Sequence, residues 1–232
     1  MTLWFLLGLS ASSLLTSLIY VLLFLPFEKT QGVVQKIFYF HVPSAFSMYA
    51  FLILGAIMAV FYLIDRRVIY DHISKAAMYT ACLFAGLVIT SGPIWAKPIW
   101  GVYWTWDPRL TTTFIVFILL LAYVFARQVL EDRERGGMKS SVIGAILAIF
   151  AVVDIPLIHF SVRLWRGIHP AVLKDPHGLT PAFARGLQVM IMSVFLLATL
   201  ICLLIFKYLQ LKQRVEQLNI QKLQQTERNL SS

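Results

Sequence analysis

Six long runs of apolar residues alternate with short polar segments along this chain. Each run is poor in charged residues and spans 17 to 23 positions, which is the length that an α-helix needs to cross the apolar core of a bilayer, about 30 Å thick. The runs cover residues 3–25, 42–64, 76–94, 110–126, 142–160 and 186–206. The pattern therefore predicts an all-α fold, a polytopic membrane protein with six transmembrane helices.

The composition of the chain supports a membrane location. Hydrophobic residues make up 59% of the chain and charged residues 13%, and the mean hydropathy is +0.77, so the chain is far more apolar than an ordinary soluble domain. Any binding site must then be built from helix ends and loops. We predict a transmembrane domain over residues 1–207 and a polar helical tail over residues 208–232. The first span lacks a basic amino-terminal region and an obvious cleavage site, which favours a retained helix over a cleaved signal peptide.

The distribution of lysine and arginine predicts the orientation of the spans. The side of the amino terminus receives twelve of these residues, Arg66, Arg67, Lys75, Arg127, Arg133, Arg135, Lys139, Lys207, Lys212, Arg214, Lys222 and Arg228. The opposite side receives eight, Lys29, Lys36, Lys97, Arg109, Arg163, Arg166, Lys174 and Arg185. Because basic residues are enriched in cytoplasmic loops, this count predicts that both termini are cytoplasmic.

Several functional classes gain no support from the sequence. Cys82 and Cys202 both lie inside predicted spans and neither belongs to a C-x-x-C motif, so we expect no thiol redox centre and no c-type haem attachment. The chain contains no nucleotide-binding motif of an ATPase, so ATP hydrolysis would require another subunit. The formal charge of +9 is spread over short loops and the tail, which is not the pattern of a nucleic-acid-binding face.

Four of the six tryptophans fall within twelve residues, in the segment WAKPIWGVYWTWDPR from Trp95 to Arg109. Tryptophan offers a large flat apolar face and one N–H donor, so a cluster beside Lys97 and Arg109 suits a flat, apolar, anionic ligand such as a porphyrin with two propionates. An aromatic belt is the alternative, although a belt is spread over both membrane interfaces. Gly101 permits close approach of a ligand, and a simple turn explains it equally well. The predicted ligand-binding residues are Trp95, Trp100, Gly101, Trp104, Trp106, Asp107 and Arg109.

Asp107 and the two tryptophans before it have more than one structural interpretation. Asp107 precedes Pro108 and the fourth span, so its side chain is well placed to cap that helix, and contact with a ligand is equally favoured. Both roles are compatible with each other. Trp100 and Trp104 share a face if the segment is helical, whereas Trp104 and Trp106 share one if it is extended.

Two histidines are predicted to lie near this loop. His41 starts the second span in FYFHVPSAF, where Pro43 suits the first turn of a helix. His169 lies in the last outer loop in LWRGIHP, where the following proline favours extended backbone. Each neutral imidazole supplies one nitrogen lone pair, so His41 and His169 are the predicted axial ligands of an iron porphyrin. A merely structural role is the alternative for either ring considered alone.

The remaining histidines are less suited to this site. His159 near the outer end of the fifth span and His177 in the last outer loop are reserves that could replace His169 or bind a propionate. His72 lies in a predicted cytoplasmic loop, on the wrong side of the membrane.

Asp154 is the only acidic residue well within a predicted span. An ionised carboxylate there costs about 3 kcal/mol on insertion scales, so we expect Asp154 to face protein or water, paired with Arg163 or hydrogen-bonded to a neighbouring helix. Pro156 frees a backbone carbonyl and is expected to kink this helix.

The run WGVYWTWDPRLTT, flanked by spans and accompanied by His41 and His169, resembles the haem-handling WWD signature of the cytochrome c maturation protein C family, also called the haem exporter protein C family. The resemblance extends to the number of spans, the total length, FHVPSA at the second span and PLIHFSVRLW before the last outer loop. It therefore covers nearly the whole chain. Related families that share the signature are much longer and have more spans.

This resemblance implies a non-enzymatic protein of the bacterial cytoplasmic membrane that binds b-type haem at the outer face. It implies delivery of the haem to a membrane-anchored periplasmic haem chaperone during cytochrome c maturation. The implied partners are an ABC ATPase subunit, a second permease-like subunit and a small single-span subunit. His41 and His169 match the two axial histidines of the family, and the tryptophan motif matches its platform. Asp154 stands where a neutral amide is expected.

Two other functions are compatible with the pattern of residues. One is a respiratory membrane subunit that retains a b-type haem and transfers electrons, although such proteins place their histidine pairs within helices at facing depths. The other is a permease that only supports an ATPase, with the tryptophans as an interface belt.

Overall fold

The structure is a computed structural model that describes residues 2–133, 138–165 and 179–231. In these residues the fold is all α, as the apolar pattern predicts. The elements in chain order are α1 (Thr2–Ile19), the π-helical turn η1 (Tyr20–Phe24), the 3-10 helix η2 (Val33–Ile37), α2 (Phe38–Asp65), α3 (Val68–Trp100), α4 (Pro108–Arg133), α5 (Met138–Val152), α6 (Asp154–Trp165) and α7 (Pro181–Ser231).

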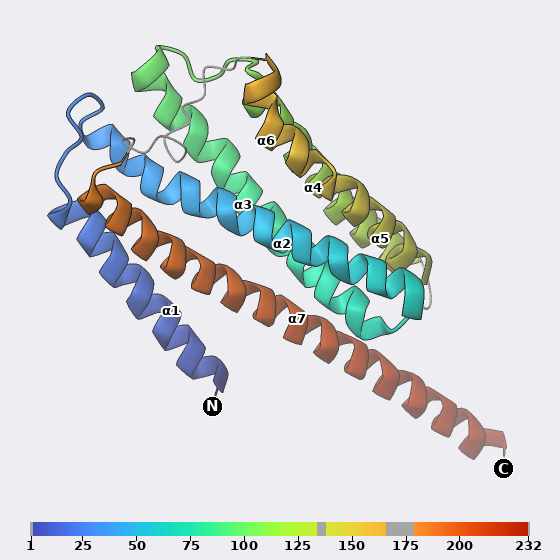
Figure 1. The fold of residues 1–232 in the computed structure, drawn as a ribbon. Helices are drawn as coiled ribbons and strands as arrows, with labels where there is room; N and C mark the ends of the chain where they lie inside the picture. Colours follow the sequence, from blue (N-terminus) through green and yellow to red (C-terminus); the bar gives the residue numbers. More distant parts are fainter. Residues whose placement is uncertain (1, 134–137, 166–178, 232) are drawn as a thin grey trace.

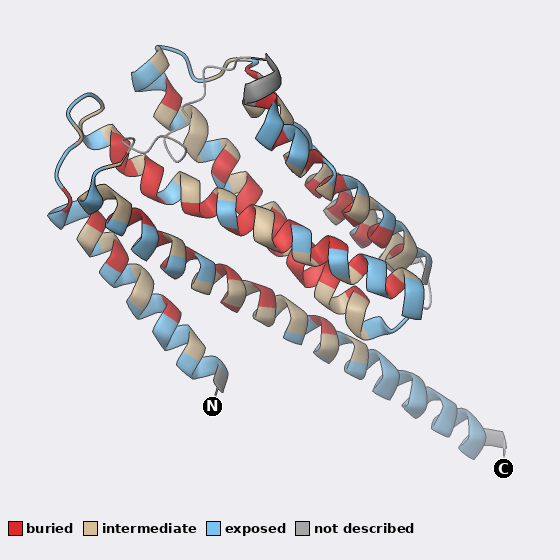
Figure 2. Ribbon diagram, viewed as in Figure 1, coloured by how far each residue is buried: buried red, intermediate tan, exposed pale blue. Residues whose placement is uncertain are grey.

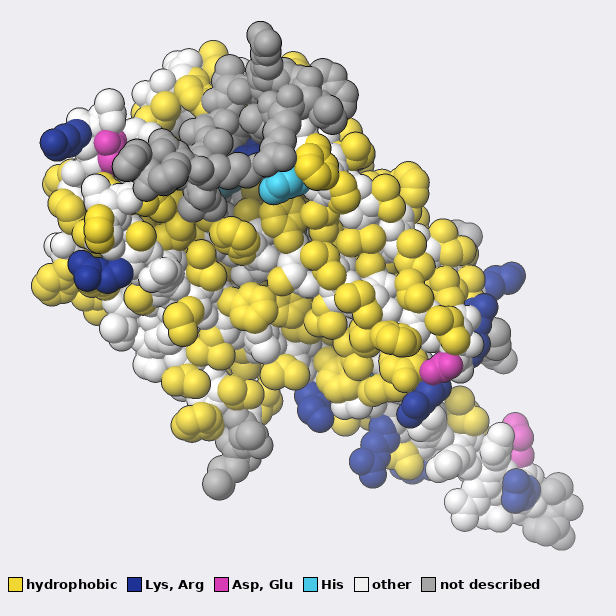
Figure 3. All heavy atoms as spheres, viewed as in Figure 1, with side chains coloured by type: hydrophobic (Ala, Val, Ile, Leu, Met, Phe, Trp, Pro, Cys, Tyr) yellow, Lys and Arg dark blue, Asp and Glu magenta, His cyan; other side chains and the backbone are white. Residues whose placement is uncertain are grey.

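The antiparallel helices α2 and α3 form the centre of the bundle (Figure 1). Helix α7 packs against α1, α2 and α3, while α4, α5 and α6 cover the other side. Buried residues are concentrated on the central helices (Figure 2). The outer helices carry many exposed apolar side chains. Hydrophobic side chains cover the flank seen in Figure 3, as expected of a surface in contact with lipid.

Within the described residues, six helical segments are long and apolar enough to cross a membrane, which agrees with the predicted number of spans. Except for the end of the first span, the helical segments begin earlier and end later than the apolar runs do. Helix α3, for example, extends from Val68 to Trp100, because polar residues continue a helix past the apolar core of the bilayer. An even number of spans returns the chain to the side on which it starts, so the described ends of α1 and α7 lie toward the same end of the bundle (Figure 1).

The fifth span is not one continuous helix. Helix α5 ends at Val152, Val153 forms a turn, and α6 starts at Asp154. Pro156 explains the interruption, because it has no N–H to donate to the carbonyl of Val152 and its ring disfavours a regular turn there. The expected kink is thus a break between two helices, and Asp154 is buried at the start of the second one.

Helix α7 runs without interruption from Pro181 to Ser231. Its first part packs within the bundle, and the residues after Leu209 are predominantly exposed (Figure 2). The polar tail predicted from the sequence therefore has helical structure that continues the last span.

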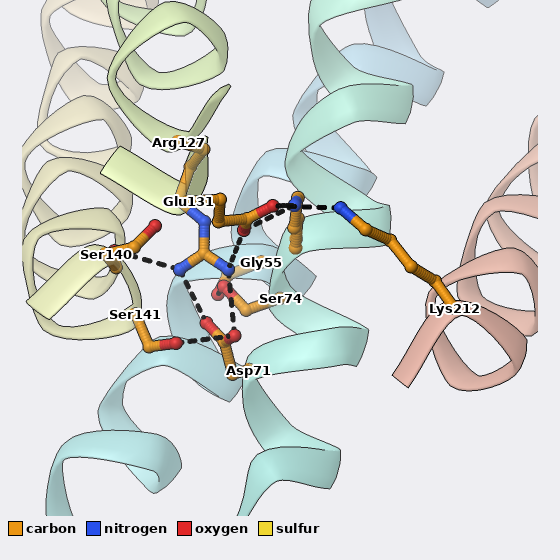
Figure 4. A network of polar contacts seen from close by, with 9 residues as sticks. Gly55, Asp71, Ser74, Arg127, Glu131, Ser140, Ser141 and Lys212 are labelled. Atoms are coloured by element: carbon orange, nitrogen blue, oxygen red, sulfur yellow. Dashed lines mark hydrogen bonds and ion pairs between the residues drawn. The ribbon is translucent and has the colours of Figure 1, made fainter. Parts of the chain in front are cut away.

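A buried set of charged and polar groups connects α3, α4 and α5 near the end of the bundle that carries the termini (Figure 4). The Arg127 guanidinium donates hydrogen bonds to both carboxylate oxygens of Asp71 at 2.9 and 2.8 Å and to the carbonyl of Ser140 at 2.9 Å. The hydroxyl of Ser141 donates to Asp71 at 2.8 Å. A bidentate ion pair such as Arg127–Asp71, with further hydrogen bonds around it, is the form in which charged side chains are tolerated in a low-dielectric interior.

Glu131 of α4 connects Arg127 to Lys75 of α3. Its carboxylate receives hydrogen bonds from the Lys75 ammonium at 2.5 and 2.6 Å and lies 3.1 Å from Arg127. We call Asp71, Lys75, Arg127, Glu131, Ser140 and Ser141 the Arg127 network. From the sequence we counted Lys75 and Arg127 only among the basic loop residues that predict the orientation of the spans, whereas both are buried within helices.

Replacing Asp71 with alanine should destabilise the fold by about 3 kcal/mol, because it leaves the buried Arg127 without its principal carboxylate. Thermal or denaturant unfolding in detergent micelles measures this change. The control is Asp65→Ala, which removes an exposed carboxylate at the end of α2 and should change the unfolding free energy by less than about 0.5 kcal/mol. Equal effects of the two variants would contradict a stabilising role for the Arg127 network.

Candidate functional site

The candidate site lies at the end of the bundle opposite the termini, where α1 connects to α2 and α3 connects to α4 (Figure 1). His41 lies near the start of α2 at this end. The helix begins at Phe38, directly after η2, so it starts before the apolar run from which it was predicted. Pro43 consequently lies in the second turn of the helix rather than in its first.

The His41 imidazole is held against α3. Its Nδ1 lies 3.0 Å from the Ser91 hydroxyl, and that hydroxyl donates its proton to the carbonyl of Leu87 at 2.6 Å. A hydroxyl has one proton, so Ser91 accepts from Nδ1–H, and the imidazole lone pair is then on Nε2. A metal-binding histidine is usually fixed in this way, by a hydrogen bond from the nitrogen that does not bind the metal.

Gly92 allows this close approach of the ring to α3. A Cβ atom at this position would lie 3.3 Å from Cε1 of His41 and 3.8 Å from its Nδ1. The first distance is shorter than ordinary van der Waals contact, so the imidazole occupies space that any larger residue would claim.

Trp95 projects from α3, as Ser91 and Gly92 do, and packs beside His41 of α2. The ring centroids of Trp95 and His41 are 5.8 Å apart with an interplanar angle of 64°, and those of Trp95 and Phe38 are 5.9 Å apart. The indole Nε1 donates a hydrogen bond to the Gln31 side chain at 3.0 Å. Trp95 is thus oriented by the segment between α1 and α2 and in turn borders His41.

A small turn positions Gln31. The Glu28 carboxylate accepts hydrogen bonds from the backbone N–H groups of Gln31 at 2.6 Å and Thr30 at 2.8 Å, and from the Thr30 hydroxyl at 2.8 Å. These donors, the Gln31 amide foremost, hold the pKa of Glu28 below its usual value. The carboxylate that accepts these hydrogen bonds is therefore ionised at neutral pH, and the turn that it organises carries Gln31, the partner of Trp95.

The tryptophan-rich segment is divided between a helix and a loop. We expected a loop over about 95–109, but α3 continues through Trp95 to Trp100 and ends at Gly101. Gly101 has φ +76°, the left-handed conformation that ends many helices and that glycine adopts without strain. The Lys97 ammonium donates to the Gly101 carbonyl at 2.8 Å and lies 5.1 Å from the Tyr103 ring, so it closes the helix end.

Trp104 and Trp106 are in the loop proper. Their ring centroids are 6.0 Å apart, and Trp104 also contacts Phe114 of α4 at 6.0 Å. The contact between the Trp104 and Trp106 rings agrees with the extended conformation, which was one of the two alternatives for this segment. The side chain of Trp106 is 75% exposed, whereas Nε1 of Trp104 and the hydroxyl of Thr105 are buried without a hydrogen-bond partner in the described part of the chain. Buried donors without partners are expensive, and a polar group of a ligand would satisfy them.

Asp107 caps α4, as predicted. The helix starts at Pro108, and Oδ1 of Asp107 accepts a hydrogen bond from the backbone N–H of Arg109 at 2.9 Å. The carbonyl of Asp107 accepts from Thr111 at 2.9 Å, which starts the regular helical pattern. The side chains of Asp107 and Arg109 are buried and half-buried, so the cap fixes the direction in which the Trp104–Trp106 loop enters α4.

The structure thus brings the predicted residues together in two pairs. His41 and Trp95 pack between α2 and α3, and Trp104 and Trp106 pack at the start of α4. His159 is exposed on α6. His169 and His177 lie outside the described residues. His72 lies in the second turn of α3 and not in a loop as predicted, and it is at the opposite end of that helix from Trp95 and Trp100.

Asp154 has an environment that the sequence did not specify. It is 5% exposed, and its Oδ2 atom has no hydrogen-bond partner among the residues that the structure describes. The predicted pairing with Arg163 is not tested, because that side chain lies outside the described part of the chain.

Sequence reasoning missed Gln31, Ser91 and Gly92. Gln31 and Ser91 act through contacts with residues 64 and 50 positions away in the chain, so no local pattern reveals them. The one available signal was the sequence Ser91-Gly92-Pro93 within an otherwise apolar span, since glycine and proline inside a helix often indicate close packing.

Comparison with known proteins identifies the relatives of this chain. The model of the family described as "Heme exporter protein C" matches residues 1–221. A heme exporter protein C from Bradyrhizobium diazoefficiens is 31% identical over 199 residues, which is 84% of this chain and 74% of the relative. The heme exporter protein C of Escherichia coli K12 is 28% identical over 185 residues, which is 78% of this chain and 72% of the relative.

Mitochondrial proteins are also similar. A putative cytochrome c biosynthesis ccmC-like mitochondrial protein from Marchantia polymorpha is 31% identical over 144 residues, which is 62% of this chain and 59% of the relative.

Replacing Asp107 with alanine should lower the free energy of unfolding by about 1 kcal/mol, because the N–H of Arg109 loses its cap. Asp107→Asn keeps an oxygen acceptor at the same position and should leave stability unchanged. Equilibrium unfolding and amide hydrogen exchange at the start of α4 measure both effects. If the asparagine variant is as unstable as the alanine variant, the negative charge matters rather than the cap.

Proposed function

This chain belongs to the heme exporter protein C family, and we propose that it binds haem at the outer face of the bacterial cytoplasmic membrane and passes it to a periplasmic haem chaperone. The family is one of multi-pass membrane proteins that handle haem in transport and cytochrome c maturation and do not catalyse a reaction. In this proposal haem is the cargo of the protein and not a permanent cofactor.

The observation that carries the proposal is the position of His41. Its imidazole lies at the tryptophan-rich end of the bundle, borders Trp95, and has its Nδ1 engaged by Ser91. That hydrogen bond leaves Nε2 as the nitrogen with the lone pair, which is what an axial ligand of haem iron requires. His169 is the proposed second ligand, with His159 or His177 as possible replacements.

The tryptophan-rich segment provides the remaining contacts that we propose. The exposed indole of Trp106 offers an apolar face to the porphyrin, and Trp95, Trp100 and Gly101 border the same end of α3. The buried N–H of Trp104 supports the proposal, because it has no acceptor among the described residues and a bound ligand or its water could accept this hydrogen bond. We propose that Arg109, at the start of α4, pairs with a propionate, and that Asp107 acts on the ligand through the cap that fixes Arg109 and the start of this helix.

The location of these groups suits transfer better than storage. A carrier must bind its cargo strongly enough to exclude water and yet release it when a partner competes. Ligands near helix ends separate at lower cost than ligands fixed at mid-membrane depth on facing helices. A respiratory subunit that retains b-type haem would need the second arrangement.

We further propose that both termini are cytoplasmic, so that the tryptophan-rich end faces the periplasm. The excess of basic residues at the other end of the bundle supports this orientation. Residues 1–207 then form the haem-handling domain and residues 208–232 a cytoplasmic helical tail. The proposed partners are an ABC ATPase subunit, a second permease subunit and a small single-span subunit, besides the chaperone.

Replacing either proposed axial ligand should remove most of the bound haem. We expect His41→Ala and His169→Ala to lower haem occupancy, because each removes one iron-binding lone pair, and Trp104→Ala and Trp106→Ala to impair transfer to the chaperone. Visible spectra of the purified protein, with and without the chaperone, measure both steps. His72→Gln, at the opposite end of α3, is the control and should keep both.

Two outcomes would contradict this function. If all four variants load the chaperone normally, the proposed site is wrong. If the purified protein holds haem that is reversibly reduced and never transferred, the protein is an electron-transfer subunit instead.

Gly92→Ala provides a finer test of the His41 position. The added methyl group would press on the imidazole of His41. We therefore expect the affinity for haem to fall several-fold and the visible absorption bands of the bound haem to shift. The matched control is Gly86→Ala on the same helix, where the added Cβ would meet only Phe117 at 3.7 Å, an ordinary contact. Haem titration of both variants measures the difference, and equal affinities would show that the approach of His41 to α3 is unimportant.

A further inference from the structure

A pocket of about 450 Å³ opens at the other end of the bundle, on the side where α7 and α4 lie over α3. This volume is within the range of ordinary small-ligand sites. Its lining residues come from these three helices and are Lys75, Tyr79, Gln128, Glu131, Ile205, Tyr208, Leu209 and Lys212. None of them belongs to the candidate haem site.

The described charged groups in and beside the pocket include more cations than carboxylates. Figure 4 shows Glu131 between Arg127 on one side and Lys212 on the other. Glu131 lies 2.5 Å from Lys75, 3.1 Å from Arg127 and 4.0 Å from Lys212. With Asp71, which pairs with Arg127, two carboxylates face three cations in this described cluster. One positive charge is therefore uncompensated.

Lys212 is the group that carries this excess. Its distance of 4.0 Å from Glu131 is the limit of an ion pair, and its side chain is 45% exposed, whereas that of Lys75 is 6% exposed. The ammonium of Lys212 thus stands at the mouth of the pocket, and the Lys75 ammonium lies deeper. The excess charge at the mouth therefore comes from Lys212, because Glu131 binds the deeper Lys75 ammonium, and it favours an anion that enters from the mouth.

The walls of the pocket are apolar on one side. Ile205 and the buried Leu209 project from α7 and lie with Tyr79 of α3 in the lining. The apolar run of α7 ends at Phe206, and lysine and arginine side chains gather around this end of the bundle (Figure 3). The pocket therefore lies at the level where the hydrocarbon of a bilayer meets its headgroups, which is also where tyrosine is enriched.

We propose that this pocket binds the headgroup of an anionic phospholipid from the adjacent leaflet. The phosphate accepts a hydrogen bond from Lys212 and one from the N–H of Lys75 that Glu131 does not bind, and the first carbons of an acyl chain lie against Ile205 and Leu209. Anionic lipids are attracted to basic groups at this level of a membrane protein. A free phosphate would use the two lysines but would leave the apolar wall without a partner.

The test compares two lysines on one helix. Lys212→Gln removes the charge at the mouth, and Lys207→Gln removes a charge from an exposed lysine on α7 that does not line the pocket. The full-length protein is placed in nanodiscs of phosphatidylcholine with increasing phosphatidylglycerol, and retained lipid is counted by native mass spectrometry. We expect Lys212→Gln to weaken phosphatidylglycerol retention about fivefold and Lys207→Gln to change it less than twofold.

A second variant and a competition experiment complete the test. Gln128→Glu places a negative charge in the lining from an exposed position on α4, and it should also weaken retention without disturbing the fold. Equal losses for Lys212→Gln and Lys207→Gln would indicate general surface attraction and overturn the proposal. Equal retention of phosphatidylcholine, or displacement of the lipid by millimolar inorganic phosphate, would overturn it as well.

Discussion

A bilayer offers no hydrogen bonds to a polypeptide within its apolar core, and this constraint governs the whole molecule. Every backbone polar group in that region must be satisfied within the chain, which is why the spans are helices. Charged side chains that are buried inside the bundle near the ends of the spans are also paired with groups of the chain. Asp71 and Arg127 meet this condition through two short hydrogen bonds and the groups of Ser140 and Ser141 around them.

The same constraint concentrates chemistry at the two ends of the bundle. At one end, α3 stops at Gly101 and the loop after it exposes the Trp106 indole, while the His41 imidazole lies near the start of α2. At the other end, basic residues meet the carboxylates of the Arg127 network. The central helices α2 and α3 connect both ends, so their packing determines where His41 and Lys75 stand.

Much of this arrangement could be predicted from local sequence. Apolar runs predicted six spans, Asp107 followed by Pro108 predicted a helix cap, and the position of His72 followed from the order of the spans. Each of these depends on neighbours within a few residues. Contacts between distant segments could not be predicted: the contacts of Gln31 with Trp95 and of Asp71 with Arg127 join residues 64 and 56 positions apart. The break at Val153 was expected only as a kink. The sequence shows Pro156 but not whether the residues before it keep their helical conformation.

Helix α7 has a mechanical consequence. Its 51 residues form one uninterrupted rod, which at 1.5 Å per residue is about 75 Å long. The rod packs along α2, the helix that carries His41, and then projects beyond the bundle. A displacement of its exposed end meets no break in the helix before Gly186, which packs against Tyr39, two residues from His41. One rigid element thus connects the two ends of the bundle mechanically.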